Sequence, residues 1–211
     1  MDWISLPIEI WQEILFISPF LCQIRLRQVS KIFYCRLEIH DFYDINDCYL
    51  ERLTDQVLIN YHFIKYLNVC NNSHVSNLNH LTKLIKLNVG DYYCGVNDQG
   101  IIQVNPIELH VNNNPKITSI NHMNRLAILN AYGNSGLTDQ GINALNLIEL
   151  DVENNQQITN INHMTRLVRL IAGGGCVIND QGIIDVNPIE LDVSDNPKVT
   201  NVNHMTKLTI T

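Results

Sequence analysis

The C-terminal three-quarters of the chain repeats itself at a stride of 41 residues. Asn-His-Met begins at Asn121, Asn162 and Asn203, and Asp-Gln-Gly recurs at the same stride from Asp98 onward. Self-similarity of this period is typical of a solenoid, in which each unit buries its apolar face only against its neighbours. Each 41-residue unit divides into two half-units of twenty-odd residues, so the sequence predicts a tandem stack of short repeats.

Within each half-unit the apolar residues keep the frame L-x-x-L-x-L-x-x-N. Leu147, Leu150, Val152 and Asn155 fill one copy. The second apolar position recurs every 20 to 22 residues, at Leu67, Leu87, Leu109, Leu129, Leu150, Leu170 and Leu191. This is the leucine-rich-repeat pattern. It predicts an α/β solenoid over residues 46–211, a horseshoe with parallel strands on its concave face and helical or 3₁₀ turns on its convex side. We expect seven complete repeats and one partial repeat that starts with a strand at Leu208.

The asparagine of the frame is expected to turn inward after each strand. Its amide can satisfy backbone groups that the bend leaves unpaired. It is found at Asn72, Asn114, Asn134, Asn155 and Asn196. Tyr92 and Gly175 replace it in two repeats, so the ladder of asparagines should be interrupted there.

Residues 1–45 depart from this frame and show the apolar period of helices. The spacing from Ile10 to Ile17 marks one helix face, and Pro7 suits the first turn. A second helix is expected from Pro19, and a third apolar series begins at Leu26. This segment predicts a small all-α domain, which could serve simply as a cap for the first repeat.

The same segment carries a known motif. Leu6-Pro7-Ile8-Glu9-Ile10, then Ile14-Leu15, then Leu26-Arg27-Gln28-Val29-Ser30-Lys31 follow one another in the order of an F-box, which they closely resemble. Thr-Asp-Gln-Gly-Ile at 138–142 is similar to the cysteine-containing repeats of F-box/leucine-rich-repeat proteins. Such proteins occur in eukaryotes and in the large DNA viruses that infect them.

This resemblance implies a non-catalytic substrate receptor without a cofactor. F-box proteins bind a Skp-type adaptor of a cullin-RING ubiquitin ligase and hold a target on their repeats, for SCF-type ubiquitin ligation in the cytoplasm or nucleus, of the host cell if the protein is viral. Carried over by position, the adaptor contacts are Leu6, Pro7, Ile10, Ile14, Leu21, Val29 and Phe33. Cys22-Gln23 departs from the motif, which commonly has an acidic residue there. The alternative is a repeat scaffold for protein–protein interaction whose N-terminal helices act only as a cap.

Outward strand positions of the later repeats are rich in acidic residues. They predict that a target protein docks a basic segment on the concave face, beside an aromatic anchor. The predicted substrate contacts are His110, Tyr132, Glu149, Asp151, Glu153, Arg169, Glu190 and Asp192. The plainer interpretation is a solvated face whose charges prevent wrong strand pairing.

Several other function classes find no support in the sequence. A formal charge of -7 argues against nucleic-acid binding, and the apolar runs are far shorter than the roughly 20 residues of a membrane span. The series His122, His163 and His204 is spaced too widely to share a zinc ion, so each imidazole is expected to bond a neighbouring loop. No catalytic motif stands out.

Two further expectations concern the cysteines and a glycine run. The six cysteines predict free, mostly buried thiols. Gly173–Gly175 predicts a flattened stretch that a partner's backbone could approach.

Overall fold

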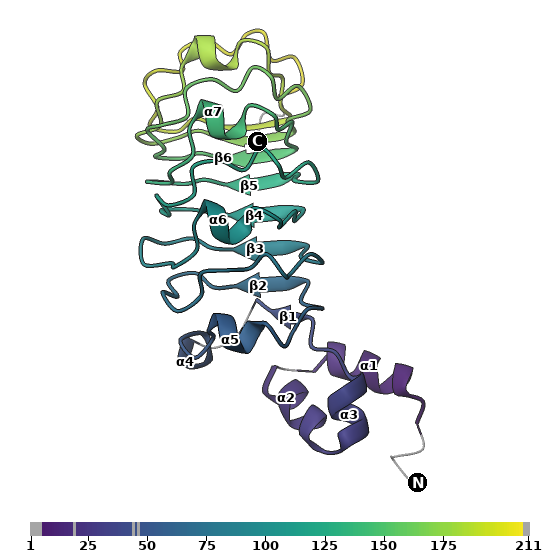
Figure 1. Ribbon diagram of the computed structural model, residues 1–211. Coiled ribbons are helices and arrows are strands. Elements are labelled where there is room, and N and C mark those ends of the chain that lie inside the picture. The colour runs from purple at the N-terminus through teal and green to yellow at the C-terminus, as the bar shows by residue number, and fades with distance from the viewer. Residues whose placement is uncertain (1–5, 19, 44, 46, 209–211) are drawn as a thin grey trace.

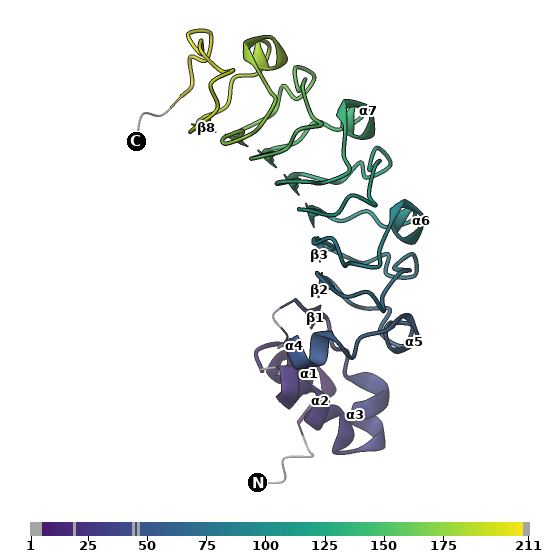
Figure 2. The same cartoon turned by 90° about the vertical axis from the view of Figure 1, so that its left-hand side faces the viewer.

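The computed structural model describes residues 6–18, 20–43, 45 and 47–208. A small helical domain lies at one end, followed by a single curved stack of repeats (Figure 1). Seen from the side, the strands line the inner side of the curve and the short helices lie on its outer side (Figure 2). The predicted class, an α/β leucine-rich-repeat solenoid with a small N-terminal helical domain, is confirmed.

Three helices form the N-terminal domain. They are α1 (Ile8–Phe16), α2 (Phe20–Gln28) and α3 (Lys31–Arg36). The first helix begins directly after Pro7, as the sequence predicts. The third helix starts later than the apolar series at Leu26 suggested, because Ser30 leaves the helical conformation and its Oγ accepts a hydrogen bond from the N–H of Phe33 at 3.1 Å.

Eight parallel strands form one sheet in sequence order. They are β1 (Asp41–Phe42), β2 (Tyr66–Asn68), β3 (Lys86–Asn88), β4 (Glu108–His110), β5 (Ile128–Asn130), β6 (Glu149–Asp151), β7 (Arg169–Ile171) and β8 (Glu190–Asp192). The central leucines of β2 to β8 stand opposite one another, which confirms the predicted register. Strand β1 lies within residues 1–45 and was missed, since it is only two residues long. Leu208 is not in a strand, and the rest of the expected final strand lies outside the described residues.

Helical or 3₁₀ turns were expected in both kinds of half-unit, but only every second return segment on the convex side carries one, and the segments between them have turns without a helix. The convex turns are α5 (Asp55–Leu58), α6 (Asp98–Ile101), α7 (Asp139–Ile142) and the 3₁₀ turn η2 (Asp180–Ile183), whereas α4 (Asp47–Leu50) follows β1 and lies beside it, away from the convex side (Figure 2). The carboxylate of Asp139 accepts bonds from the Thr159 hydroxyl (2.6 Å) and N–H (2.7 Å) of the next half-unit, and Asp98 and Asp180 do the same one unit away. The aspartates of the Asp-Gln-Gly motif therefore join neighbouring repeats.

The predicted ladder of inward asparagines is right at four positions and wrong at one. Asn72, Asn114, Asn155 and Asn196 are buried, but Asn134 is exposed and Ser135 takes the inward place. Tyr92 and Gly175 are also exposed, with Cys94 and Cys176 buried two and one residues later. The inward residue after each strand thus alternates along the chain. One half-unit buries an asparagine, and the next half-unit buries a small cysteine or serine in the corresponding place.

The glycine run from Gly173 serves the packing of the solenoid itself. Gly174 has a φ of +60°, and a Cβ there would lie 2.4 Å from Oδ1 of Asn154. A Cβ on Gly173 would lie 2.7 Å from the carbonyl oxygen of Ser194 in the next repeat. The backbone that approaches this stretch closely therefore belongs to the same chain. The packing of the repeats explains the glycines without a partner protein.

The helical domain shares its apolar core with the first repeats. Leu15 is fully buried in the same cluster as the leucines of the sheet. The ring of Phe42 packs edge-on between Phe20 (5.0 Å between centroids) and Tyr61 (5.1 Å). The amide of Gln12 also bonds both backbone groups of Glu38. These contacts fix α1 and α2 to the beginning of the sheet.

Candidate protein-interaction surfaces

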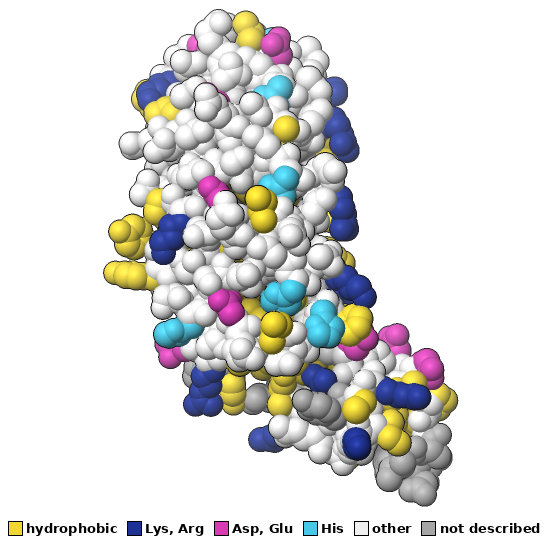
Figure 3. Space-filling model, in the orientation of Figure 1, with side chains coloured by type: hydrophobic (Ala, Val, Ile, Leu, Met, Phe, Trp, Pro, Cys, Tyr) yellow, Lys and Arg dark blue, Asp and Glu magenta, His cyan; other side chains and the backbone are white. Residues whose placement is uncertain are grey.

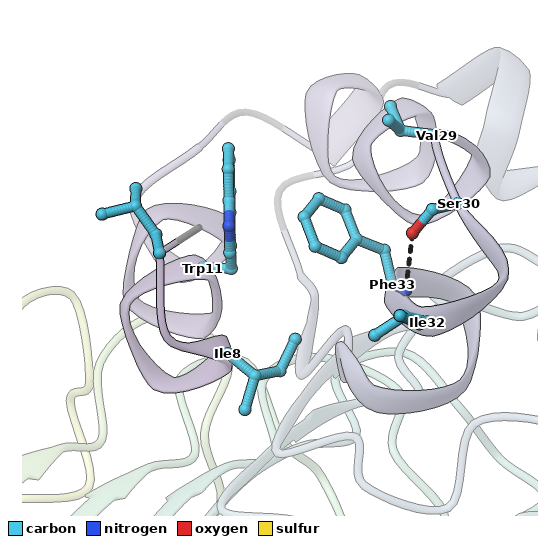
Figure 4. Close-up of a pocket in the computed structure, with 7 residues that line it drawn as sticks. Ile8, Trp11, Val29, Ser30, Ile32 and Phe33 are labelled. Atoms are coloured by element: carbon cyan, nitrogen blue, oxygen red, sulfur yellow. Dashed lines mark hydrogen bonds between the residues drawn. The ribbon is translucent and has the colours of Figure 1, made fainter. Parts of the chain in front are cut away.

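An apolar hollow opens between α1 and α3. It measures about 240 Å³ and is lined by Leu6, Ile8, Trp11, Val29, Ser30, Ile32 and Phe33. The rings of Trp11 from α1 and Phe33 from α3 contact each other in its lining, with ring centroids 4.9 Å apart (Figure 4). Large apolar side chains at its rim stay in solvent: Val29 is 72% exposed and Ile32 is 63% exposed. Exposed apolar surface of this kind is typical of places where proteins contact one another.

The predicted adaptor contacts are divided between this hollow and the face of α1. Leu6, Val29 and Phe33 line the hollow, although Phe33 is almost fully buried as its inner wall. Pro7 and Ile10 are exposed at the start of α1, and Ile14 is half-buried. Leu21 lies in α2, and its side chain is outside the described part of the structure.

Sequence reasoning did not name Ile8, Trp11 and Ile32 as contacts, yet all three line the hollow. The available signal was the excess of apolar residues around α1, which is more than a single packed stripe requires. The indole Nε1 of Trp11 is buried and has no hydrogen-bond partner within the described residues. A buried donor that is left unpaired costs free energy.

A second hollow lies on the concave face, across strands β4 to β7. The structure brings His110, Glu149, Asp151 and Arg169 together here, four of the eight predicted substrate contacts. Ile128 and Ile171 also line the hollow and were not predicted. Tyr132, Glu153, Glu190 and Asp192 are on the same face of the sheet but outside the lining. The site is therefore a mixed acidic and apolar depression.

Charges at the N-terminal side of this hollow are paired with one another. Glu108 lies 2.7 Å from His110 and 2.9 Å from the Nζ of Lys86, and this Nζ also lies 4.4 Å from the ring centre of Tyr43. Burial acts to raise the pKa of Glu108, but the hydrogen bonds from His110 and Lys86 together outweigh it, and the pKa lies below its ordinary value. This part of the face is a structural ion-pair network.

On the C-terminal side of the hollow, the carboxylates are less fully paired with cations. Arg169 contacts Glu190 at 3.2 Å between Nε and Oε2, in the open. Asp151 accepts a hydrogen bond from the Asn130 amide at 2.9 Å. Burial raises the pKa of Asp151 above its ordinary value, and the nearby Asp192 adds to this, while Arg169 opposes it. A carboxylate that is partly desolvated in this way would gain from a cationic partner.

The repeated histidines have a structural role, as the sequence predicted. Nε2 of His122 lies 3.0 Å from the carbonyl oxygen of Ile101, and His163 and His204 make the same contact with Ile142 and Ile183. Within the described residues, no group of three His, Cys, Asp or Glu side chains could hold a metal ion.

The five cysteines whose side chains the structure describes are free but less buried than we expected. Cys94 and Cys176 are buried, whereas Cys22 and Cys35 are exposed and Cys70 is half-buried. Burial raises the pKa of the Cys94 thiol to about 11, so it stays protonated at neutral pH. In the part of the chain that the structure covers, every helix falls short of the length and apolar character needed to cross a bilayer.

Comparison with known proteins identifies the helical domain. Residues 3–44 match the model of the F-box domain. No curated protein sequence gives a significant match. Five solved chains are similar in structure. One is an internalin from Listeria monocytogenes, with 18% sequence identity and a TM-score of 0.46, over 81% of this chain and 57% of the internalin chain.

The architecture and the family match together define the class. The chain carries an F-box domain at residues 3–44, followed by an α/β leucine-rich-repeat solenoid. The expectation drawn from Leu6-Pro7 and the following motif is confirmed. Both parts are of the kind that mediates protein–protein contact.

Proposed function

We propose that this protein is the non-catalytic substrate receptor of an SCF-type ubiquitin ligase. Its F-box binds a Skp-type adaptor, and its concave face holds a target protein. The observation that carries the proposal is the apolar hollow around Trp11 and Phe33, whose rim of exposed side chains lies within the segment that matches the F-box domain. The site of action would be the cytoplasm or nucleus.

The first half of the proposal depends on apolar surface that the fold leaves uncovered. Ile10, Val29 and Ile32 are between 46% and 72% exposed, although the same domain buries Leu15 completely. At about 25 cal/mol per Å² of apolar surface, covering several such side chains supplies a substantial part of a binding free energy. A cap for the first repeat would need none of them outside the core.

The second half rests on the concave depression of β4 to β7. Glu149 and Asp151 stand on one strand between Ile128 and Ile171. This arrangement suits the side chain of a lysine or arginine in the target, with its aliphatic stem on the isoleucines and its charge on the carboxylates. We therefore propose a target with a basic segment.

Adaptor binding is tested with the full chain and a purified Skp-type adaptor. The double variant Val29→Asp/Ile32→Asp should weaken binding at least tenfold, since both side chains lie at the rim and neither supports the core. The matched control is Ile102→Asp/Ile184→Asp, which changes two isoleucines that are 52% and 48% exposed on the convex side. Isothermal titration calorimetry measures both, and unfolding curves verify that each variant is folded.

The proposal fails if the rim variant binds the adaptor as well as the control does. In that case the helices serve as a cap, and the protein is a repeat scaffold without a ligase. Target binding is tested separately, by cross-linking and mass spectrometry of proteins recovered with the wild type and with Glu149→Lys/Asp151→Lys. Recovery that is indifferent to this charge reversal places the target elsewhere.

A further inference from the structure

A row of cationic side chains runs along one long edge of the solenoid. It contains Lys83, Arg125, Arg166 and Lys207, which are all exposed and follow one another at 42, 41 and 41 residues. Lys83, Arg125 and Arg166 each lie three residues before a strand begins, on the edge where the chain enters the sheet, and Lys207 has the corresponding place in the repeat. Figure 3 shows Lys and Arg side chains following the right-hand edge of the solenoid from one end to the other.

The spacing of this cationic edge is set by the repeat. The backbone N–H of Arg125 donates to Oδ1 of Asn105 at 3.1 Å, and Arg166 makes the same bond to Asn146 at 3.0 Å. The same contact recurs one unit further along. Arg125, Arg166 and Lys207 are therefore held in equivalent backbone positions, one for every second strand. At about 4.8 Å per strand, neighbouring cations start about 10 Å apart.

These cations differ from those of the concave face in having no acidic partner. Lys86 and Arg169 are both in ion pairs, whereas none of the four edge residues is in a salt bridge within the described part of the chain. Lys83 lies 4.2 Å from the ring centre of Phe63. In a chain with a formal charge of -7, a row of unpaired cations on one edge is a marked asymmetry.

The centre of the edge is hollowed. A depression of about 250 Å³ lies between Arg125 and Arg166 and is lined by side chains that include Ala144, Asn146 and Ile148. Asp185 takes the place of Ala144 in the next 41-residue unit. Its negative charge reduces the positive potential between Arg166 and Lys207, whereas no acidic residue does so at this place between Arg125 and Arg166. The guanidinium groups of Arg125 and Arg166 thus flank an open, partly apolar depression.

We infer that the cationic edge binds an acidic segment of a partner protein, with Glu or Asp at every third residue in the polyproline II conformation. This conformation has three residues per turn and a rise of about 3.1 Å per residue, so every third side chain points the same way at intervals of about 9.3 Å. That interval matches the ~10 Å between the edge cations. A β-strand turns alternate side chains to opposite faces and cannot present every third one.

A protein segment fits this edge better than a nucleic acid does. A nucleic-acid strand carries a charge on every nucleotide, and the acidic surface elsewhere on the chain repels the charges that meet no cation. A spaced acidic peptide places charge only where the edge supplies an arginine or lysine. The inference concerns a surface distinct from the F-box and the concave hollow, and it stands whether or not an adaptor binds.

The test uses the full chain and fluorescently labelled 12-residue peptides, with binding followed by anisotropy at low salt. The probe is (Glu-Pro-Pro)₄, and a peptide of the same composition with its four glutamates clustered at one end is the register control. Arg125→Gln/Arg166→Gln should weaken binding of the spaced peptide by between about twofold and thirtyfold, the loss of two exposed ion pairs. Arg36→Gln/Lys198→Gln makes the same charge change away from the edge and should leave binding unchanged.

The expected result is that the spaced peptide binds more tightly than the clustered one and that only the edge variant loses this preference. The inference is overturned by equal binding of the two peptides, by equal losses in the two variants, or by the absence of binding. Tighter binding of a 12-residue oligothymidine than of the spaced peptide also overturns it, in favour of a nucleic-acid surface.

Discussion

The buried asparagine at Asn155 offers the sharpest test of how the repeats are held together. Its Nδ2 donates to the carbonyl oxygen of Ala131 and to Oγ of Ser135, both at 3.0 Å. Its Oδ1 accepts from the N–H groups of Gln157 and Ile158, at 2.8 and 3.0 Å. One fully buried amide therefore joins its own turn to the preceding half-unit.

The loss of stability expected for Asn155→Ala follows from the backbone and side-chain groups that the substitution leaves without a hydrogen-bond partner. Gln157 is exposed, and its N–H can find water. The carbonyl oxygen of Ala131, Oγ of Ser135 and the N–H of Ile158 belong to buried residues and lose a partner. An orphaned buried polar group costs about 1 to 3 kcal/mol, so three of them predict a loss of at least about 3 kcal/mol in the free energy of unfolding. That is a large share of the 5 to 15 kcal/mol typical of a domain.

Asn134→Ala is the matched control. Asn134 fills the same place in the sequence frame one half-unit earlier, but its side chain is exposed. The expected cost is within about 0.5 kcal/mol, as for other surface substitutions. Urea denaturation followed by far-ultraviolet circular dichroism measures both variants, with the slope of the transition as a check that unfolding stays cooperative. Equal losses in the two variants, or a loss below about 1 kcal/mol for Asn155→Ala, would refute the reasoning.

Three further predictions concern the turns, the ion-pair network and the domain junction. Gly174→Ala should destabilise the protein by about 1 to 3 kcal/mol, because φ is positive and Asn154 is in the way, whereas Gly175→Ala should be nearly neutral; similar melting curves for both would contradict this. Since the pKa of Glu108 is depressed in the folded state, its carboxylate stabilises the fold above its ordinary pKa of 4.5, and this contribution is lost as the pH falls through the folded value. Glu108→Gln should therefore lower stability at pH 7, and its difference from the wild type should shrink as the pH falls below 4.5 in parallel urea titrations; a difference that is constant with pH would disprove the assignment. Phe42→Ala should cost about 3 to 5 kcal/mol and expose the helical domain to proteolysis before the repeats; simultaneous cleavage of both parts would show that the junction is elsewhere.

The repeat architecture was predictable because its leucines carry two signals at once. The alternation around Leu150 marks a strand, and its recurrence every 20 to 22 residues marks a stack. Asn134 was misplaced because the frame fixes a position in the sequence but not the direction of a side chain. Gly133 and Asn154 both have a positive φ (+68° and +59°), yet Asn134 is exposed and Asn155 is buried, so the backbone turn before the frame position does not decide which side chain is buried.

The candidate sites were predicted less completely, for a related reason. Val29 and Phe33 were found from the F-box motif, whereas Ile32 lies between them and is not part of the motif residues that we used. On the concave face, charged outward positions drew attention, and Ile128 and Ile171 were passed over. Whether a side chain lines a hollow depends on the neighbouring strands, and that information is absent from any single repeat.

The alternation of long and short inward side chains has a consequence for how this molecule can change in size. Because the pattern of Asn155 above Ser135 closes only after two strands, the smallest piece that can be copied or lost without mismatched contacts is 41 residues. Each such step moves the far end of the arm by about 10 Å. The length of the solenoid would therefore change in steps of about 10 Å, and a longer or shorter relative would place its far end at a different fixed distance while keeping the same contacts between repeats.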